Sequence, residues 1–262
     1  MEFLREFFGF GEGYKRTPEG YMSWQHIVFV TSLMLIMIAL AIFLGLRNRN
    51  KDEKIKNKVL IWFAFLIDGF ELFKFVIVCS RQASIKPMLY MLPLFLCSIQ
   101  LITIPLAAFA KGRVKEAALD FVFIFGILGA FAGTYGAGQN YNAYPVLSFD
   151  NVVSGITHAI SGFASLYIVI SNMASMKTKN IWITFTILIS FCVAAYIADI
   201  LIPYNYMFLM NHDGTPYVMF YNLVKGNKIL YPLIVVILFL LYISVFYLVY
   251  LAIRKRQNKK TA

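Results

Sequence analysis

Residues 24–46 read WQHIVFVTSLMLIMIALAIFLGL, and residues 47–58, which follow directly, read RNRNKDEKIKNK. The first stretch is long enough to cross a bilayer as a helix, because the hydrocarbon core requires about 20 apolar residues. The second holds six Lys and Arg residues, a density typical of a short cytoplasmic loop. Together they predict a membrane-spanning helix whose C-terminal end faces the cytoplasm.

The composition extends this prediction to the whole chain. Of the 262 residues 60% are hydrophobic and only 14% are charged, which excludes an ordinary soluble domain with one apolar core. The formal net charge of +11 gathers in short loops. The tendency of Lys and Arg to stay on the cytoplasmic side explains that charge, so we expect no nucleic acid partner.

Further apolar stretches predict an all-α, polytopic membrane protein with seven transmembrane helices. The predicted spans are residues 24–46, 59–80, 88–110, 117–136, 151–173, 181–202 and 229–253. Residues 1–20 place phenylalanines among charges, which is typical of a segment lying in the membrane interface. We therefore expect an interfacial segment, 1–20, and a single seven-helix domain, 21–262.

The distribution of basic residues predicts the orientation. The loops after the first, third and fifth predicted spans and the C-terminal segment hold six, three, two and five Lys or Arg. The N-terminal segment and the loops after the second, fourth and sixth spans hold three, two, none and two. An outside N-terminus, a cytoplasmic C-terminus and a multi-pass location in the plasma (cytoplasmic) membrane follow.

The third predicted span carries unusual groups in Met91-Leu-Pro-Leu-Phe-Leu-Cys-Ser-Ile-Gln100. Pro93 lacks an N–H and loosens a helix, while Ser98 and Gln100 need polar partners that lipid does not supply. Cys97 lies near mid-membrane if each residue adds about 1.5 Å. This segment is expected to face protein or water on at least one side.

Asp68, Glu71 and Lys74 recur every three residues in the second predicted span. They cover roughly 120° of one helical face, and a charge at mid-membrane costs about 2.5–3.5 kcal/mol on the insertion scale. Glu71 and Lys74 are expected to form an ion pair. The three charges are either an interhelical clamp or part of a hydrated substrate site.

His158 lies in the fifth predicted span among Ser and Thr residues, at a depth similar to that of Cys97. It is either a hydrogen-bonded core histidine or the base that an activated thiol requires. Asp199, near the outer end of the sixth span, could orient an imidazole or bind the following loop. That loop, residues 203–216, is rich in aromatic and turn residues and is expected to form an ordered lid on the membrane surface.

Two further patterns have mainly structural interpretations. Gly126, Gly129, Gly133 and Gly136 recur at helical spacing and predict close packing against another helix; a substrate passage is the alternative. Cys79 and Cys192 have no polar neighbours in the sequence and are expected to be small core residues.

Several short motifs resemble those of the YwaF-type integral membrane proteins of bacteria: Leu-Pro-Leu-Phe-Leu-Cys-Ser at 92–98, Glu71-x-x-Lys74, the histidine of the fifth span and Asn-Tyr-Met-Phe-Leu at 205–209. Those proteins often have a histidine where this chain has Phe95. They are distantly similar to a eukaryotic family of multispanning proteins that move acyl chains between phospholipids by means of a cysteine and a histidine. The resemblance implies acyl transfer through a thioester on Cys97.

Two functions are therefore considered. In the first, Cys97 attacks a phospholipid ester, His158 moves the proton, a lysolipid or lipoprotein accepts the acyl group, and Gln100, Ser98 or Lys74 stabilises the oxyanion. In the second, the protein is a non-enzymatic lipid or small-molecule binder, a transporter or sensor, whose pocket is lined by Asp68, Glu71, Lys74 and Asp199. Neither function requires a cofactor or a metal site.

Overall fold

The computed structural model describes residues 2–11 and 13–261, with side chains up to residue 256. Every regular element in this part of the chain is helical, which confirms the all-α prediction. The helices are α1 (Glu2–Phe8), α2 (Trp24–Asn48), α3 (Glu53–Gln82), η1 (Lys86–Tyr90), α4 (Gln100–Phe109), α5 (Gly112–Ala132), α6 (Gly138–Ala143), α7 (Phe149–Ile170), η2 (Thr178–Asn180), α8 (Ile181–Leu201), η3 (Tyr206–Phe208), α9 (Val218–Leu223) and α10 (Leu230–Thr261).

By length and apolar composition, four helical segments in the described chain can cross a membrane: Trp24–Asn48, Phe149–Ile170, Thr178–Leu201 and Leu230–Arg256. They correspond to the first, fifth, sixth and seventh predicted spans. The second predicted span lies in α3, and the fourth, 117–136, extends four residues past α5, which ends at Ala132. These helices have 30 and 21 residues but carry more charged side chains.

The third predicted span is not one helix, so the prediction of a continuous helix over 88–110 is wrong. The chain forms η1, then an irregular segment over 91–99, and only then α4. Pro93 supplies no N–H and disfavours helical geometry at Leu92. The Ser98 hydroxyl accepts from Phe95 N at 3.0 Å and donates to Phe95 O at 3.1 Å, which stabilises a turn instead of a helix.

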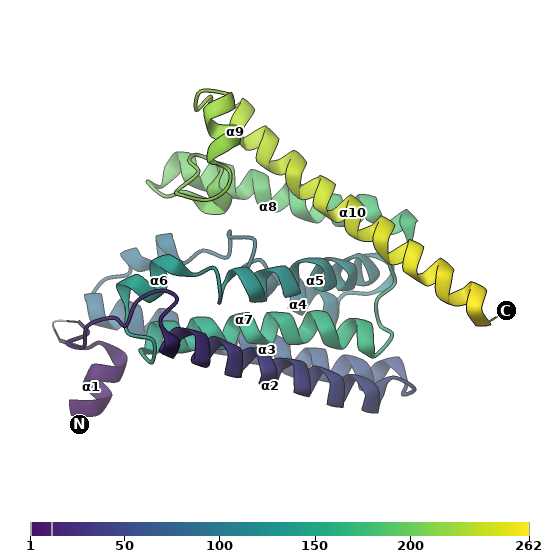
Figure 1. Ribbon diagram of the computed structural model, residues 1–262, viewed down its shortest axis with the longest axis horizontal. Coiled ribbons are helices and arrows are strands. Elements are labelled where there is room, and N and C mark those ends of the chain that lie inside the picture. Colours follow the sequence, from purple (N-terminus) through teal and green to yellow (C-terminus); the bar gives the residue numbers. More distant parts are fainter. Residues whose placement is uncertain (1, 12, 262) are drawn as a thin grey trace.

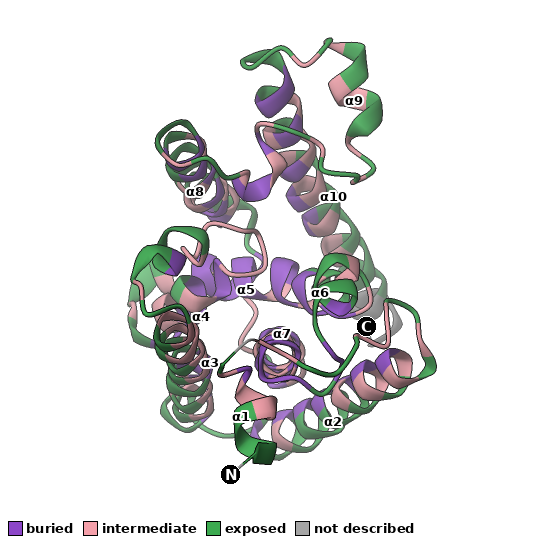
Figure 2. Ribbon diagram, turned by 90° about the vertical axis from the view of Figure 1, so that its left-hand side faces the viewer, coloured by how far each residue is buried: buried purple, intermediate pink, exposed green. Residues whose placement is uncertain are grey.

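Helix α7 is the centre of the bundle, with α2, α3, α4 and α5 around it (Figure 2). In its apolar window 67% is buried, against 22–28% for the other three candidate spans. Its glycines and serines make this possible, because small residues allow neighbouring backbones to approach closely. At Gly126 of α5, for example, an added Cβ would lie 2.6 Å from the carbonyl oxygen of Ser161.

Helices α8 and α10 form a second layer over α5 (Figure 1). The layer is joined to the bundle by aromatic packing, such as Phe123 against Phe246 at 5.0 Å between ring centroids. It is also joined through the buried carboxylate of Asp120, which accepts from the Tyr247 hydroxyl at 2.9 Å and from Ser175 N at 3.0 Å. A buried carboxylate needs such donors to offset its lost hydration.

The basic connections α2–α3, α4–α5 and α7–α8 lie at the end of the bundle where the C-terminus lies, on the right in Figure 1. Helices α1 and α6 and the α8–α9 connection lie at the opposite end, called the N-terminal end below. This arrangement puts the segments with many Lys and Arg on one side, as the predicted topology requires.

The N-terminal segment is attached to its end of the bundle through Tyr14, which bonds to an ion pair between α3 and α7. Arg81 donates from both terminal nitrogens to Asp150, at 2.7 and 2.8 Å, and the two side chains are only 14% and 10% exposed. The Tyr14 hydroxyl, from the segment preceding α2, donates to the same carboxylate. This three-residue cluster is called the Arg81 clamp.

Candidate functional site

One cavity of about 240 Å³ lies at the N-terminal end of the bundle. Its walls come from α3, η1, the irregular segment, α4, α6, α7 and the lid. The residues that line it are Ile67, Glu71, Lys74, Tyr90, Met91, Leu92, Phe95, Cys97, Ser98, Leu101, Asn140, Ser154, Thr157, His158 and Tyr204. Cys97 and His158, which the sequence singled out from two separate segments, therefore face the same space.

Cys97 lies in the turn that leads into α4. Its Cα and Cβ are 3.4 and 3.5 Å from the position of a Cβ built on Gly129 of α5, which is ordinary van der Waals contact. The backbone N–H groups of Cys97 itself and of Ser98 donate to no backbone acceptor within the described residues. Both residues precede α4, whose N-cap is Ile99, so neither N–H belongs to a helix.

His158 projects from α7 onto α5, where its imidazole lies directly over Gly133. Gly129 and Gly133 are four residues apart, so the faces that they present are about 5–6 Å apart on one side of the helix. The glycine pattern thus has the predicted packing role at Gly126, Gly129 and Gly133. Two of these glycines make room for Cys97 and His158 in adjacent turns.

Glu71 and Lys74 enter the cavity from α3. Lys74 Nζ lies 3.6 Å from Glu71 Oε1, with the two side chains 21% and 23% exposed. This confirms that the two residues pair. The separation exceeds the 2.7–2.9 Å that is usual for a charge-assisted hydrogen bond, so the ammonium group is held loosely.

Asp68 is exposed and does not line the cavity. Successive residues of a helix are about 100° apart, so Asp68 is rotated by that angle from Ile67, whereas Glu71 and Lys74 lie within about 40° of it. The shared face predicted for Asp68, Glu71 and Lys74 is therefore limited to the last two.

Gln100 and Asp199 also lie outside the cavity lining. Gln100 is fully buried and its Oε1 accepts from the Thr103 hydroxyl at 3.1 Å, while its Nε2 has no partner among the described residues. Asp199 Oδ1 accepts from Tyr206 N at 2.7 Å. Of the two roles considered for Asp199, the structure has the one that binds the loop after α8.

The lid is ordered and holds the segment that bears Cys97. The hydroxyl of Tyr206 donates to Leu89 O at 2.5 Å and accepts from Leu92 N at 3.3 Å. Tyr206 is completely buried, and burial raises the pKa of its hydroxyl to about 12. Its neighbour Tyr204 lines the cavity, and its ring centroid is 5.3 Å from that of Tyr90. The lid therefore fixes one wall of the site.

The structure adds polar cavity residues for which no site role was predicted, namely Tyr90, Asn140, Ser154, Thr157 and Tyr204. Their convergence depends on how η1, α6 and the lid fold over the bundle, which no local pattern encodes. Cys79 is partly exposed, contrary to its prediction as a core residue, whereas Cys192 is buried as predicted. Within the described residues, no three His, Cys, Asp or Glu side chains converge as a metal site would require.

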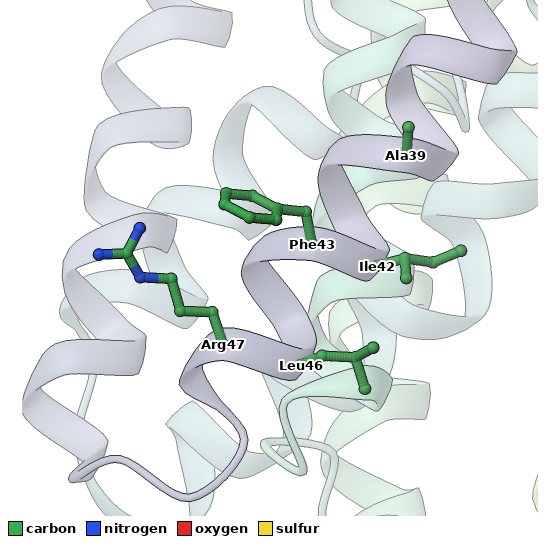
Figure 3. Close-up of a pocket in the computed structure, with 5 residues that line it drawn as sticks. All are labelled: Ala39, Ile42, Phe43, Leu46 and Arg47. Atoms are coloured by element: carbon green, nitrogen blue, oxygen red, sulfur yellow. The ribbon is translucent and has the colours of Figure 1, made fainter.

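A second depression lies on α2 and is lined by Ala39, Ile42, Phe43, Leu46 and Arg47 (Figure 3). It is larger, at about 670 Å³, but it is very open and comes from one helix. Its one polar side chain, Arg47, has no catalytic partner there. The cavity that contains Cys97 and His158 is therefore the candidate functional site.

Long apolar helices around a small polar cavity define a multi-pass helical membrane protein. A comparison with protein-family models matches residues 21–250 to the TMEM164 family. This match covers most of the chain, so the protein belongs to the TMEM164 family, a family of membrane proteins. No curated protein and no solved structure gave a significant match.

Proposed function

We propose that the protein is a membrane-embedded acyltransferase in which Cys97 carries the acyl group and His158 moves the proton. One observation supports this above all: a thiol and an imidazole from separate segments line the same small cavity. Covalent catalysis of this kind needs a nucleophile and a base in one site, and this cavity contains both. The resemblance of residues 92–98 to YwaF-type proteins points to the same chemistry.

In the first half of the reaction, His158 takes the proton of the Cys97 thiol and the sulfur attacks the carbonyl carbon of a phospholipid ester. The carbonyl π electrons move to oxygen and form a tetrahedral oxyanion. When the C=O bond re-forms, the bond to the glycerol oxygen breaks, and His158 returns the proton to that oxygen. A lysolipid leaves and a thioester remains on Cys97.

In the second half, the hydroxyl of a lysolipid, or a hydroxyl or amine of a lipoprotein, attacks the thioester. His158 takes the proton of the incoming group, and the C–S bond breaks. The proton then returns to the sulfur, so the enzyme is regenerated with no net gain or loss of electrons. No cofactor is needed, because transfer to a hydroxyl exchanges one ester for another and transfer to an amine forms a more stable amide.

The oxyanion needs donors at the cavity side of Cys97. The backbone N–H groups of Cys97 and Ser98 belong to the nucleophile and to the residue after it, and they donate to no backbone acceptor within the described residues. Backbone N–H groups serve as oxyanion donors in other acyl-transfer sites. Gln100, considered from the sequence, does not reach the cavity lining, and the Ser98 hydroxyl is engaged by Phe95. Lys74, the third candidate, lines the cavity but is paired with Glu71. We therefore assign this role to the two backbone groups.

The test is acyl transfer from a labelled phospholipid to a lysolipid by the purified protein in nanodiscs, followed by mass spectrometry of the lipids. Wild type should transfer the label, whereas Cys97→Ser and His158→Ala should fall at least a hundredfold. Cys192→Ala, which changes a thiol outside the cavity, is the matched control. Full transfer by Cys97→Ser would exclude the thioester mechanism and favour the alternative, a non-enzymatic lipid-binding membrane protein.

The proposal also includes seven crossings of the plasma membrane. Besides the four long apolar helices, α3 and α5 would each cross, and η1, the irregular segment and α4 would together make one further crossing. Irregular backbone at membrane depth is tolerated where it lines a cavity within the protein. The segment that bears Cys97 meets this condition, because residues 91, 92, 95, 97 and 98 all face the cavity.

A further inference from the structure

Lys74 is the only cation among the residues that line the cavity described above. Its ammonium group has three donors, yet in the described part of the chain its close polar partner is Glu71, at 3.6 Å. Such a loose pair leaves donor capacity for a ligand. The cavity thus contains a cation whose hydrogen bonds are not fully used.

Two uncharged donors share the cavity with Lys74. Ser154 of α7 and Asn140 of α6 both line it. Neither the hydroxyl of Ser154 nor the amide of Asn140 forms a side-chain hydrogen bond within the described residues, although Ser154 is only 9% exposed. An ammonium, a hydroxyl and an amide facing one space form a donor set that suits an anionic group with several acceptor oxygens.

A phosphate group fits this donor set better than a carboxylate does. The cavity already contains a carboxylate, that of Glu71, but the 3.6 Å between it and the Lys74 ammonium shows that this carboxylate does not use the full donor capacity of Lys74. The cavity volume, about 240 Å³, is below the usual range for drug-sized ligands, about 300–1,000 Å³. It suits a phosphate and the glycerol attached to it, with acyl chains lying outside between protein and membrane.

We propose that Lys74, assisted by Ser154 and Asn140, binds the phosphate group of the lipid substrate. This inference rests on the proposed function for the identity of the ligand as a phospholipid. In such a lipid the phosphate is only a few bonds from an ester, so a phosphate at Lys74 holds that ester in the same cavity as Cys97. Glu71 is the counter-ion that keeps Lys74 in place until phosphate replaces it.

Binding of two matched probes in the Cys97→Ser background tests this inference without any acyl transfer. Lysophosphatidic acid and monoacylglycerol with the same acyl chain differ only in the phosphate. Protein with Lys74 should bind the phosphate-bearing probe at least tenfold more tightly. In Glu71→Gln/Lys74→Met, which removes both charges so that neither is stranded, the ratio of the two affinities should fall to about one.

Lys86→Met is the control for loss of an exposed positive charge, because Lys86 does not line the cavity, and the tenfold ratio should persist. Ser154→Ala and Asn140→Ala should each reduce the ratio two- to fivefold in a folded protein. Inorganic phosphate is the competitor that separates lipid phosphate from the free ion. It should not displace lysophosphatidic acid at equal concentration.

An unchanged ratio in the double variant would overturn the inference, as would equal displacement by inorganic phosphate. Either result would leave acyl transfer through Cys97 intact. Conversely, a protein that binds lysophosphatidic acid through Lys74 but transfers no acyl group would contradict only the proposed function.

Discussion

The imidazole of His158 lies against the backbone of Gly133, where any Cβ would overlap the ring. The position of the base therefore depends on the absence of a side chain on a different helix. Gly133 tolerates no substitution unless His158 moves from the position in which it lines the cavity.

Gly133→Ala should displace His158 and reduce acyl transfer at least tenfold. Overpacking of this kind costs about 1–3 kcal/mol of stability, so the thermal unfolding temperature should fall as well. Gly69→Ala is the control, because a Cβ built there meets nothing within 4 Å and alanine is the better helix former. Unchanged transfer by Gly133→Ala would mean that the position of His158 is not required for the reaction.

Asp150→Asn should loosen the N-terminal segment, because it leaves Arg81 without its charged partner in a poorly exposed site. Breaking a buried ion pair costs on the order of 3 kcal/mol. Limited proteolysis should then cut residues 13–23 faster than in wild type. Glu2→Gln, in an ion pair whose side chains are 76% and 92% exposed, should behave like wild type. Equal proteolysis of the two variants would argue against the Arg81 clamp.

The lid should loosen at alkaline pH. Burial raises the pKa of Tyr206 from 10.0 to about 12, so the folded state holds this proton more tightly than the unfolded state does. The resulting stabilisation is complete below pH 10 and is lost as the pH rises towards 12. Stability measured between pH 9 and 12 should therefore fall more in wild type than in Tyr206→Phe. Parallel curves would show that Tyr206 does not titrate in this way.

The membrane topology predicts that residues 47–58 and 254–260 are cytoplasmic and that Asn140 and Asn211 are outside. Single cysteines introduced at these four places, in a protein whose native cysteines are replaced, should react with impermeant thiol reagents accordingly. Labelling of any one of them from the opposite side would contradict the seven-span arrangement.

The helical fold could be predicted from the sequence because long apolar stretches and basic loops are local features. The break in the third span was predictable only as a weakness at Pro93. Its extent depends on Tyr206, which binds Leu89 and Leu92 from a distant part of the chain. Pro105, by contrast, lies inside α4 without ending it, so proline alone does not decide where a helix stops.

Part of the candidate site was also accessible from sequence. His158, Glu71 and Lys74 stood out because ionisable side chains are costly in an apolar segment, and Cys97 stood out as a thiol beside Ser98 and Gln100. All four line the cavity. Asp68 is also ionisable, but it is rotated by about 100° around its helix from Ile67, which lines the cavity. The sequence alone does not show which side of the helix faces the cavity. Asn140 and Tyr204 lie between predicted spans, where polar residues are common and therefore do not indicate a site.

The central claim is that Cys97 carries an acyl group, and the most direct test is the intact mass of the protein after incubation with a phospholipid of one defined acyl chain. Wild type should gain the mass of that acyl group, hydroxylamine should remove it as expected for a thioester, and the adduct should persist in Cys79→Ala and Cys192→Ala. His158→Ala should abolish it while the protein remains folded. An unmodified wild-type mass under conditions in which the lipid reaches the cavity would contradict the claim.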